Sequence, residues 1–167
     1  MSISFFKSTI YFALLLITLT FFCCGSPDNY QELSGNYFFR GGDGDGILSH
    51  IPGQGNIYGK VISYNFDDEF ILARQLPEYA DHKSMLSSML LGDLKRYPQH
   101  SSQDIARSQV AADSILKYNY MYKKIFSAKE NYWIISHQNR KVYGPLNREE
   151  YKIKMTSLQV PDQLQLE

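Results

Sequence analysis

The sequence predicts an α+β domain preceded by a signal-peptide segment, with an antiparallel β-meander of about six strands in hairpins and helices packed on one side. Three observations lead to this prediction. An uncharged apolar stretch lies near the N-terminus. Three pairs of segments rich in β-branched and aromatic residues are each joined by a short polar turn. A long stretch with apolar residues at helical spacing separates the second pair from the third.

The composition limits the classes of function. The 167 residues correspond to one domain, or to one domain plus a targeting segment. The 17 basic and 17 acidic residues give a net charge of +0, so we do not expect a nucleic-acid partner. The two cysteines are adjacent, which predicts neither a disulfide framework nor a spaced zinc site. Tyrosine is unusually frequent, with 13 copies.

The N-terminal segment has the pattern of a secretion signal. Lys7 is the only charged residue before Asp28, and the apolar run that follows Lys7 is roughly 13 residues long. This length suits a signal peptide and is short for a membrane span of about 20 residues. The run ends at residues 23–27, Cys-Cys-Gly-Ser-Pro, which resembles the lipobox of bacterial lipoproteins. An uncleaved anchor helix and an ordinary secretory signal are the alternatives.

The residue before the cleaved bond favours Cys24 as the lipidated residue. That position should be small, and it would be Cys23 for Cys24 but the bulky Phe22 for Cys23. We therefore predict a signal peptide at 1–23, a tether at 24–34 and a single α+β domain at 35–162. The implied location is the cell envelope, with the chain anchored through its N-terminal lipid to the outer or the inner membrane. Modification of Cys23 instead remains open.

Three hairpins form the predicted meander. The first pairs strands 37–40 and 47–51 across a turn at 41–46. The second pairs 57–64 and 69–74 across 65–68. The third pairs 132–137 and 141–144 across 138–140. The glycine-rich turn at 41–46 also contains two aspartates, the ligand type that calcium prefers. It lacks the remaining ligands of an EF-hand, so we interpret it as a solvated turn and predict no metal site and no cofactor.

The helices are predicted from periodicity and capping residues. The first helix rests on Met85, Leu86, Met89, Leu90 and Leu94 and ends before Pro98. The second begins at a Ser101 or Ser102 cap, and the residues on its predicted apolar face are Ile105, Ala112, Ile115, Leu116 and Asn119. A short helix at 119–127 follows.

The last predicted helix begins at Asn147 as its N-cap. Glu149 and Glu150 suit the positive end of the helix dipole. Pro161 marks the end of this helix.

Several segments resemble an uncharacterised family of small bacterial lipoproteins, classed as a domain of unknown function. They are residues 66–75, the Tyr-Trp-Ile-Ile segment at 132–135, the Val-Tyr-Gly-Pro-Leu segment at 142–146, 149–151 and 160–162. The resemblance spans most of residues 35–162. It implies a lipoprotein and a compact domain, and no reaction.

A few side chains qualify as candidate site residues. Asp67 and Asp68 are adjacent carboxylates that could serve in acid–base chemistry, or form a polar hairpin tip. His50 and His137 lie on predicted strands and could meet in space. The alternative for all four is a structural or surface role. An envelope hydrolase that uses this Asp/His set is therefore the second hypothesis for the function.

Tyrosines are concentrated late in the chain. Tyr118, Tyr120 and Tyr122 are candidates for a binding surface, because tyrosine offers a large contact area at little entropic cost. Half-buried strands also use tyrosine heavily. We find no complete catalytic motif and assign no catalytic residue. The leading expectation is a membrane-anchored binding or structural module with a protein or envelope partner.

Overall fold

A computed structural model describes residues 30–42 and 45–166, and within them the fold is α+β as predicted. The predicted signal peptide, both cysteines and the two turn residues Asp43 and Gly44 lie outside the described residues. The strands are β1 (Tyr30–Glu32), β2 (Tyr37–Arg40), β3 (Gly46–Ser49), β4 (Ile57–Tyr58), β5 (Lys60–Phe66), β6 (Phe70–Leu76), β7 (Asn131–Ser136) and β8 (Lys141–Leu146). The helices are α2 (Tyr79–Leu91), α3 (Ser102–Tyr118), α4 (Tyr120–Phe126) and α5 (Arg148–Leu158).

The strands form two antiparallel sheets instead of one meander of about six strands. The small sheet has the order β1-β2-β3-β4 and the large sheet β5-β6-β7-β8. The three predicted hairpins are present as β2–β3, β5–β6 and β7–β8. Two strands were not predicted as separate elements. Gly59, at φ 90°, divides the predicted strand 57–64 into β4 and β5. Strand β1 lies within the range predicted as the tether.

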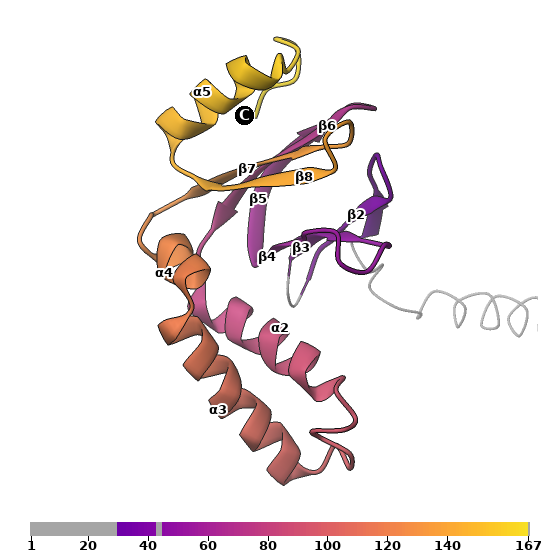
Figure 1. The fold of residues 1–167 in the computed structure, drawn as a ribbon, viewed down its shortest axis with the longest axis vertical. Coiled ribbons are helices and arrows are strands. Elements are labelled where there is room, and N and C mark those ends of the chain that lie inside the picture. The colour runs from indigo at the N-terminus through magenta and orange to yellow at the C-terminus, as the bar shows by residue number, and fades with distance from the viewer. Residues whose placement is uncertain (1–29, 43–44, 167) are drawn as a thin grey trace, which may run out of the picture.

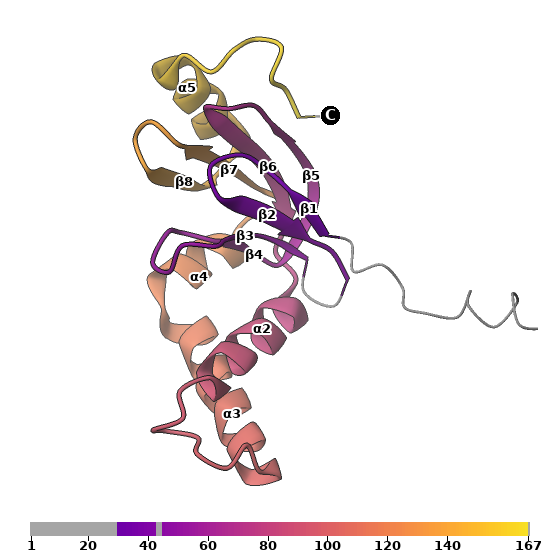
Figure 2. The same cartoon turned by 90° about the vertical axis from the view of Figure 1, so that its right-hand side faces the viewer.

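The large sheet is covered on both faces, so the helices do not all pack on one side as predicted. Because successive side chains of a strand alternate between faces, Ile71 and Ala73 face one core while Phe70 and Leu72 face the other. The first core also contains residues of the small sheet and of α4. The second is closed by α5 and the C-terminal segment. Figures 1 and 2 show α5 on one side of the large sheet and the small sheet on the other.

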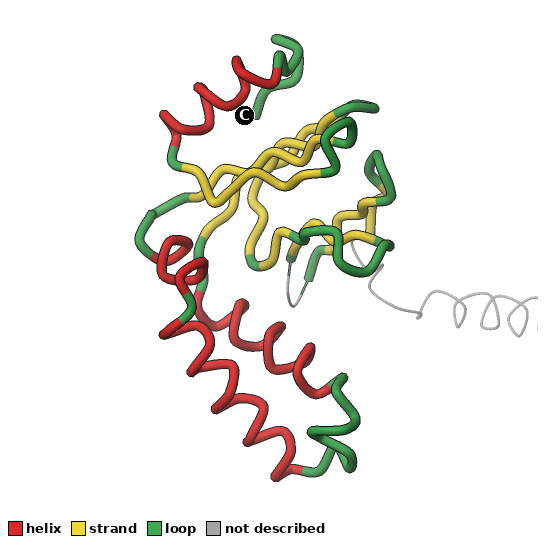
Figure 3. The backbone as a smooth tube through the Cα atoms, in the orientation of Figure 1, coloured by secondary structure: helices red, strands yellow, loops and turns green. Residues whose placement is uncertain are grey.

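Helices α2 and α3 are inserted between the adjacent strands β6 and β7 and project away from the sheets (Figures 2 and 3). Helix α2 is shorter than predicted. It ends at Leu91, where Gly92 is the C-cap, so Leu94 lies beyond it and is 64% exposed. The helical spacing of apolar residues extends to Leu94 in the sequence, but the helix itself stops at Gly92.

The buried side of α3 differs in part from the predicted apolar face. Ser101 caps this helix as predicted, accepting a hydrogen bond from the backbone of Asp104. Ala112 and Leu116 are buried, but the prediction for Ile105 is wrong, since its exposed fraction is 42%. Polar residues occupy the rest of the buried side, among them Ser108.

The two short helices match their predictions closely. Helix α4 falls within the predicted 119–127. Asn147 caps α5 in a capping box with Glu150, and Gln159, at φ 56°, ends the helix before Pro161. No described helix has both the length and the apolar character required to cross a membrane.

Candidate ligand-binding cavity

A cavity of about 310 Å³ lies where both sheets meet α2 and α4, and we refer to it as the junction cavity. Its volume is near the lower limit of typical small-molecule sites. Aromatic and uncharged polar side chains line much of it, and no Asp, Glu, Lys or Arg among the described residues does. Its lining residues include Asn56, Tyr58, Gln75, His82, Tyr122 and Trp133.

His82 is the most unusual side chain of this cavity. It lies near the start of α2, and its exposed fraction is 2%. Neither ring nitrogen has a hydrogen-bond partner among the described residues. The neighbouring rings of Tyr122 and Phe126 meet the imidazole edge to face, at centroid distances of 5.7 and 5.2 Å. Buried polar groups normally have partners, so this imidazole has unused hydrogen-bonding capacity.

The surroundings keep the His82 ring neutral. Burial lowers its pKa from 6.5 to about 4, because an apolar environment disfavours the charged imidazolium. Gly59 contributes to this close packing, since a Cβ atom there would lie 2.7 Å from Nε2 of His82. At neutral pH one ring nitrogen can therefore donate a hydrogen bond and the other can accept one.

Hydrogen bonds join several other side chains of the cavity lining. The indole Nε1 of Trp133 donates to Oε1 of Gln75 over 3.0 Å, and Nε2 of Gln75 donates to the backbone carbonyl of Tyr58. Nδ2 of Asn56 donates to the hydroxyl of Tyr58 over 2.6 Å. These bonds hold the side chains of Trp133, Gln75 and Asn56 in place without a ligand, which lowers the cost of binding.

The three candidate tyrosines have different surroundings. Tyr122 is half-buried and lines the junction cavity, and burial raises the pKa of its hydroxyl. Tyr118 and Tyr120 do not line it and are 66% and 76% exposed. The structure thus brings only Tyr122 to this site.

The two candidate histidines are held by different partners. Nε2 of His50 lies 3.2 Å from the Glu32 carboxylate, and the ring packs on Phe38 at 4.5 Å. Nε2 of His137 lies 2.9 Å from the hydroxyl of Ser34. Burial lowers the pKa of His137, and the charge of Asp67 partly offsets this effect. No hydrogen bond or ring contact joins the two histidines within the described part of the chain.

The acidic pair sits at the β5–β6 turn. Oδ1 of Asp67 accepts hydrogen bonds from the backbone N–H groups of Glu69 and Phe70, at 2.8 and 2.7 Å. Asp68 is exposed. Asp67 therefore stabilises the turn in the way expected of a polar hairpin tip. Within residues 30–42 and 45–166, no group of three or more His, Cys, Asp or Glu side chains could hold a metal ion.

Sequence reasoning missed His82. The residue lies on a helix with no motif around it, and its ring neighbours belong to α4, which follows the whole of α3 in the chain. No local signal distinguishes it from the other histidines. Only the packing of α2 against Gly59 and α4 does so.

Comparison with protein families shows a similarity in the C-terminal part of the chain. Residues 105–167 match the family model described as a protein of unknown function, DUF3997. The match includes Tyr122 and Trp133 of the junction cavity but not His82, and it leaves out the segment at 66–75. No curated protein matches the chain, and no solved structure does. The C-terminal part of the chain is therefore similar to an uncharacterised domain family.

Proposed function

We propose that this chain is a lipid-anchored protein of the bacterial envelope whose domain binds a small neutral ligand in the junction cavity. The anchoring half of the proposal is supported by the uncharged N-terminal run that ends at Cys23 and Cys24. Diacylation of a cysteine adds two lipid chains, and two chains give stable membrane attachment.

The observation that carries the binding half is the buried, unpartnered and neutral His82 in a cavity without charged lining residues, among the residues described. A charged ligand would lose its hydration there without meeting an opposite charge. A neutral molecule with several hydroxyl groups can instead use His82 as donor and acceptor, with the aromatic rings as apolar walls. A single sugar ring is a molecule of this kind.

Binding is proposed instead of catalysis because no described acid or nucleophile is hydrogen-bonded to the His82 imidazole. Both of its nitrogens lack a hydrogen-bond partner in the described part of the chain. In a site with an activated nucleophile, the nucleophile normally lies within hydrogen-bond reach of its base.

Metabolic labelling with an alkyne fatty acid tests the anchoring. We expect the wild type and Cys23→Ala to take up the label and to fractionate with membranes, and Cys24→Ala to remain unlabelled. The Cys23→Ala variant is the matched control, because it removes a neighbouring thiol of the same kind. Label retained on Cys24→Ala would reject the assignment of the lipid to this residue.

Fluorescence of Trp133 tests the ligand class, because it is the only tryptophan of the chain and lines the junction cavity. Glucose, glucuronate and glucosamine share one ring and differ in charge. Each sugar is titrated into the full-length chain in a detergent without a sugar headgroup. We expect glucose to change the Trp133 emission saturably and the two charged sugars to leave it unchanged. An equal response to all three would contradict a neutral ligand.

Met121→Arg supplies the variant for the same titration. Met121 lines the cavity and is 44% exposed, so the arginine would bring a charge to the cavity mouth with little effect on the core. Met89→Arg is the control at a similar exposure, 52%, on a residue that does not line the cavity. We expect the response to glucose to be lost in the first variant and kept in the second.

A further inference from the structure

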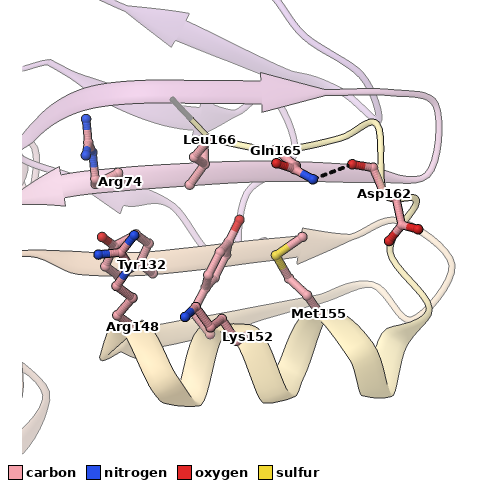
Figure 4. Close-up of a pocket in the computed structure, with 9 residues that line it drawn as sticks. Arg74, Tyr132, Arg148, Lys152, Met155, Asp162, Gln165 and Leu166 are labelled. Carbon is pink, nitrogen blue, oxygen red and sulfur yellow. Dashed lines mark hydrogen bonds between the residues drawn. The ribbon is translucent and has the colours of Figure 1, made fainter.

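A second pocket lies on the other side of the large sheet. Its volume is about 360 Å³, and it is bounded by β6 and β7, by α5 and by the C-terminal segment (Figure 4). It shares no lining residue with the junction cavity. We refer to it as the α5 pocket.

Three basic side chains line the α5 pocket: Arg74 of β6, and Arg148 and Lys152 of α5. None of them forms an ion pair within residues 30–42 and 45–166, whereas Lys60 of β5 and Lys124 of α4 each do. Arg148 and Lys152 are four residues apart on one helix, a spacing at which like charges repel. An anion between them would relieve this repulsion.

Among the described residues, one carboxylate lines the pocket, and it lies far from the arginines. Asp162 is at the opposite end from Arg74 and Arg148, as Figure 4 shows. The two arginines therefore make one end of the pocket basic, and Asp162 makes the opposite end acidic. Apolar and aromatic side chains make up the rest of this lining: Met155, Leu166 and the paired rings of Tyr132 and Tyr151, whose centroids lie 5.0 Å apart.

An unpartnered hydroxyl is buried in the same pocket. Tyr151 is 7% exposed, and its hydroxyl has no hydrogen-bond partner among the described residues. Nε of the half-buried Arg74 lacks one as well. Both groups are hydrogen-bond donors, and both would be satisfied by the oxygen atoms of an anion. Burial also raises the pKa of the Tyr151 hydroxyl, so it keeps its proton for donation.

We propose that the α5 pocket binds a small organic anion, a carboxylate or phosphate ester that carries an apolar group. Its oxyanion is held by Arg74, Arg148 and Lys152 and accepts a hydrogen bond from Tyr151. Its apolar group lies against the Met155 end of the pocket. The site is independent of the junction cavity and takes a ligand of opposite character, charged instead of neutral.

Isothermal titration of the full-length chain in a neutral detergent tests this site. The probes are phenyl phosphate, phenylacetate, inorganic phosphate and the neutral benzyl alcohol. We expect phenyl phosphate or phenylacetate to bind saturably and at least tenfold more tightly than the other two. Equal binding of benzyl alcohol would overturn the requirement for an anion. Equal binding of inorganic phosphate would overturn the requirement for an apolar group.

Variants locate the binding. Arg148→Gln combined with Lys152→Gln should weaken binding of the preferred probe at least tenfold. Lys154→Gln is the control for net charge, since Lys154 belongs to the same helix but does not line the pocket. No saturable binding by the wild type, or an effect of Lys154→Gln as large as that of Lys152→Gln alone, would reject the proposal.

Tyr151→Phe separates a binding role from a structural one. The variant removes an unsatisfied buried hydroxyl, so its thermal midpoint should not fall below that of the wild type. Binding of the preferred probe should nevertheless weaken several-fold. Unchanged affinity would show that the hydroxyl takes no part in the site. Emission from Trp133 should not respond to these probes, which separates this result from the test of the junction cavity.

Discussion

At the scale of single residues, the centre of the domain depends on a few buried polar groups. Gln75 is fully buried on a strand that is otherwise largely apolar, and it joins Trp133 to the backbone of Tyr58. This amide satisfies two groups at once, an indole N–H and a carbonyl oxygen. Its loss would leave both unpaired in the core, which costs more than the loss of a hydrogen bond at the surface.

We expect Gln75→Leu to lower the free energy of unfolding by about 2 kcal/mol or more, the usual cost of unpaired buried polar groups. Urea denaturation followed by circular dichroism measures this change. Gln138→Leu, at an exposed position in the β7–β8 turn, should leave the stability within about 0.5 kcal/mol of the wild type. Equal stability of Gln75→Leu and the wild type would show that the amide is not part of the core network.

The roles of these polar groups could not be predicted from the sequence. Gln75 bonds to Trp133, 58 positions along the chain, and the ring neighbours of His82 belong to α4. Contacts at such separations leave no local sequence pattern. The caps at Ser101 and Asn147 involve residues two or three positions away, so they could be predicted.

At the scale of elements, local sequence patterns predicted the three hairpins. Tertiary contacts determined how the strands divide into two sheets and which side of α3 is buried. The β-type residues of 57–64 do not reveal that Gly59 turns the chain from the small sheet into the large one. The predicted face of α3 was partly wrong because α2 and α3 meet through small polar side chains. The hydroxyls of Ser87 and Ser108 lie 2.7 Å apart in this contact, which apolar periodicity does not detect.

Gly59 provides a test at this scale. Its φ of 90° disfavours any side chain, and a Cβ atom would also lie 2.7 Å from Nε2 of His82. Gly53 is the matched control, with a φ of 84° and no atom within 4 Å of an added Cβ. By chemical denaturation, both alanine variants should lose about 1 kcal/mol for the backbone, and Gly59→Ala should lose more through the contact. Equal losses would indicate that His82 does not pack against Gly59.

At the scale of the whole molecule, the large sheet separates two pockets of different character. The junction cavity has no charged lining residue among those described, and the α5 pocket has three basic ones. If Cys24 carries the lipid, only residues 25–29 lie between the anchored residue and β1, and the six steps from Cys24 to Tyr30 reach at most about 20 Å. The proposed anchor would therefore hold the small sheet close to the membrane surface.

Measurement of the His82 side-chain ¹⁵N shifts by NMR as a function of pH tests the junction cavity most directly. We expect a neutral ring at pH 5.5, because burial where the two sheets meet α2 and α4 lowers the pKa to about 4. The assignment can be checked with His82→Gln, whose spectrum should lack these signals. A ring that instead titrates near its ordinary pKa of about 6.5 would contradict a buried, unpartnered His82, since it would place the imidazole in contact with water.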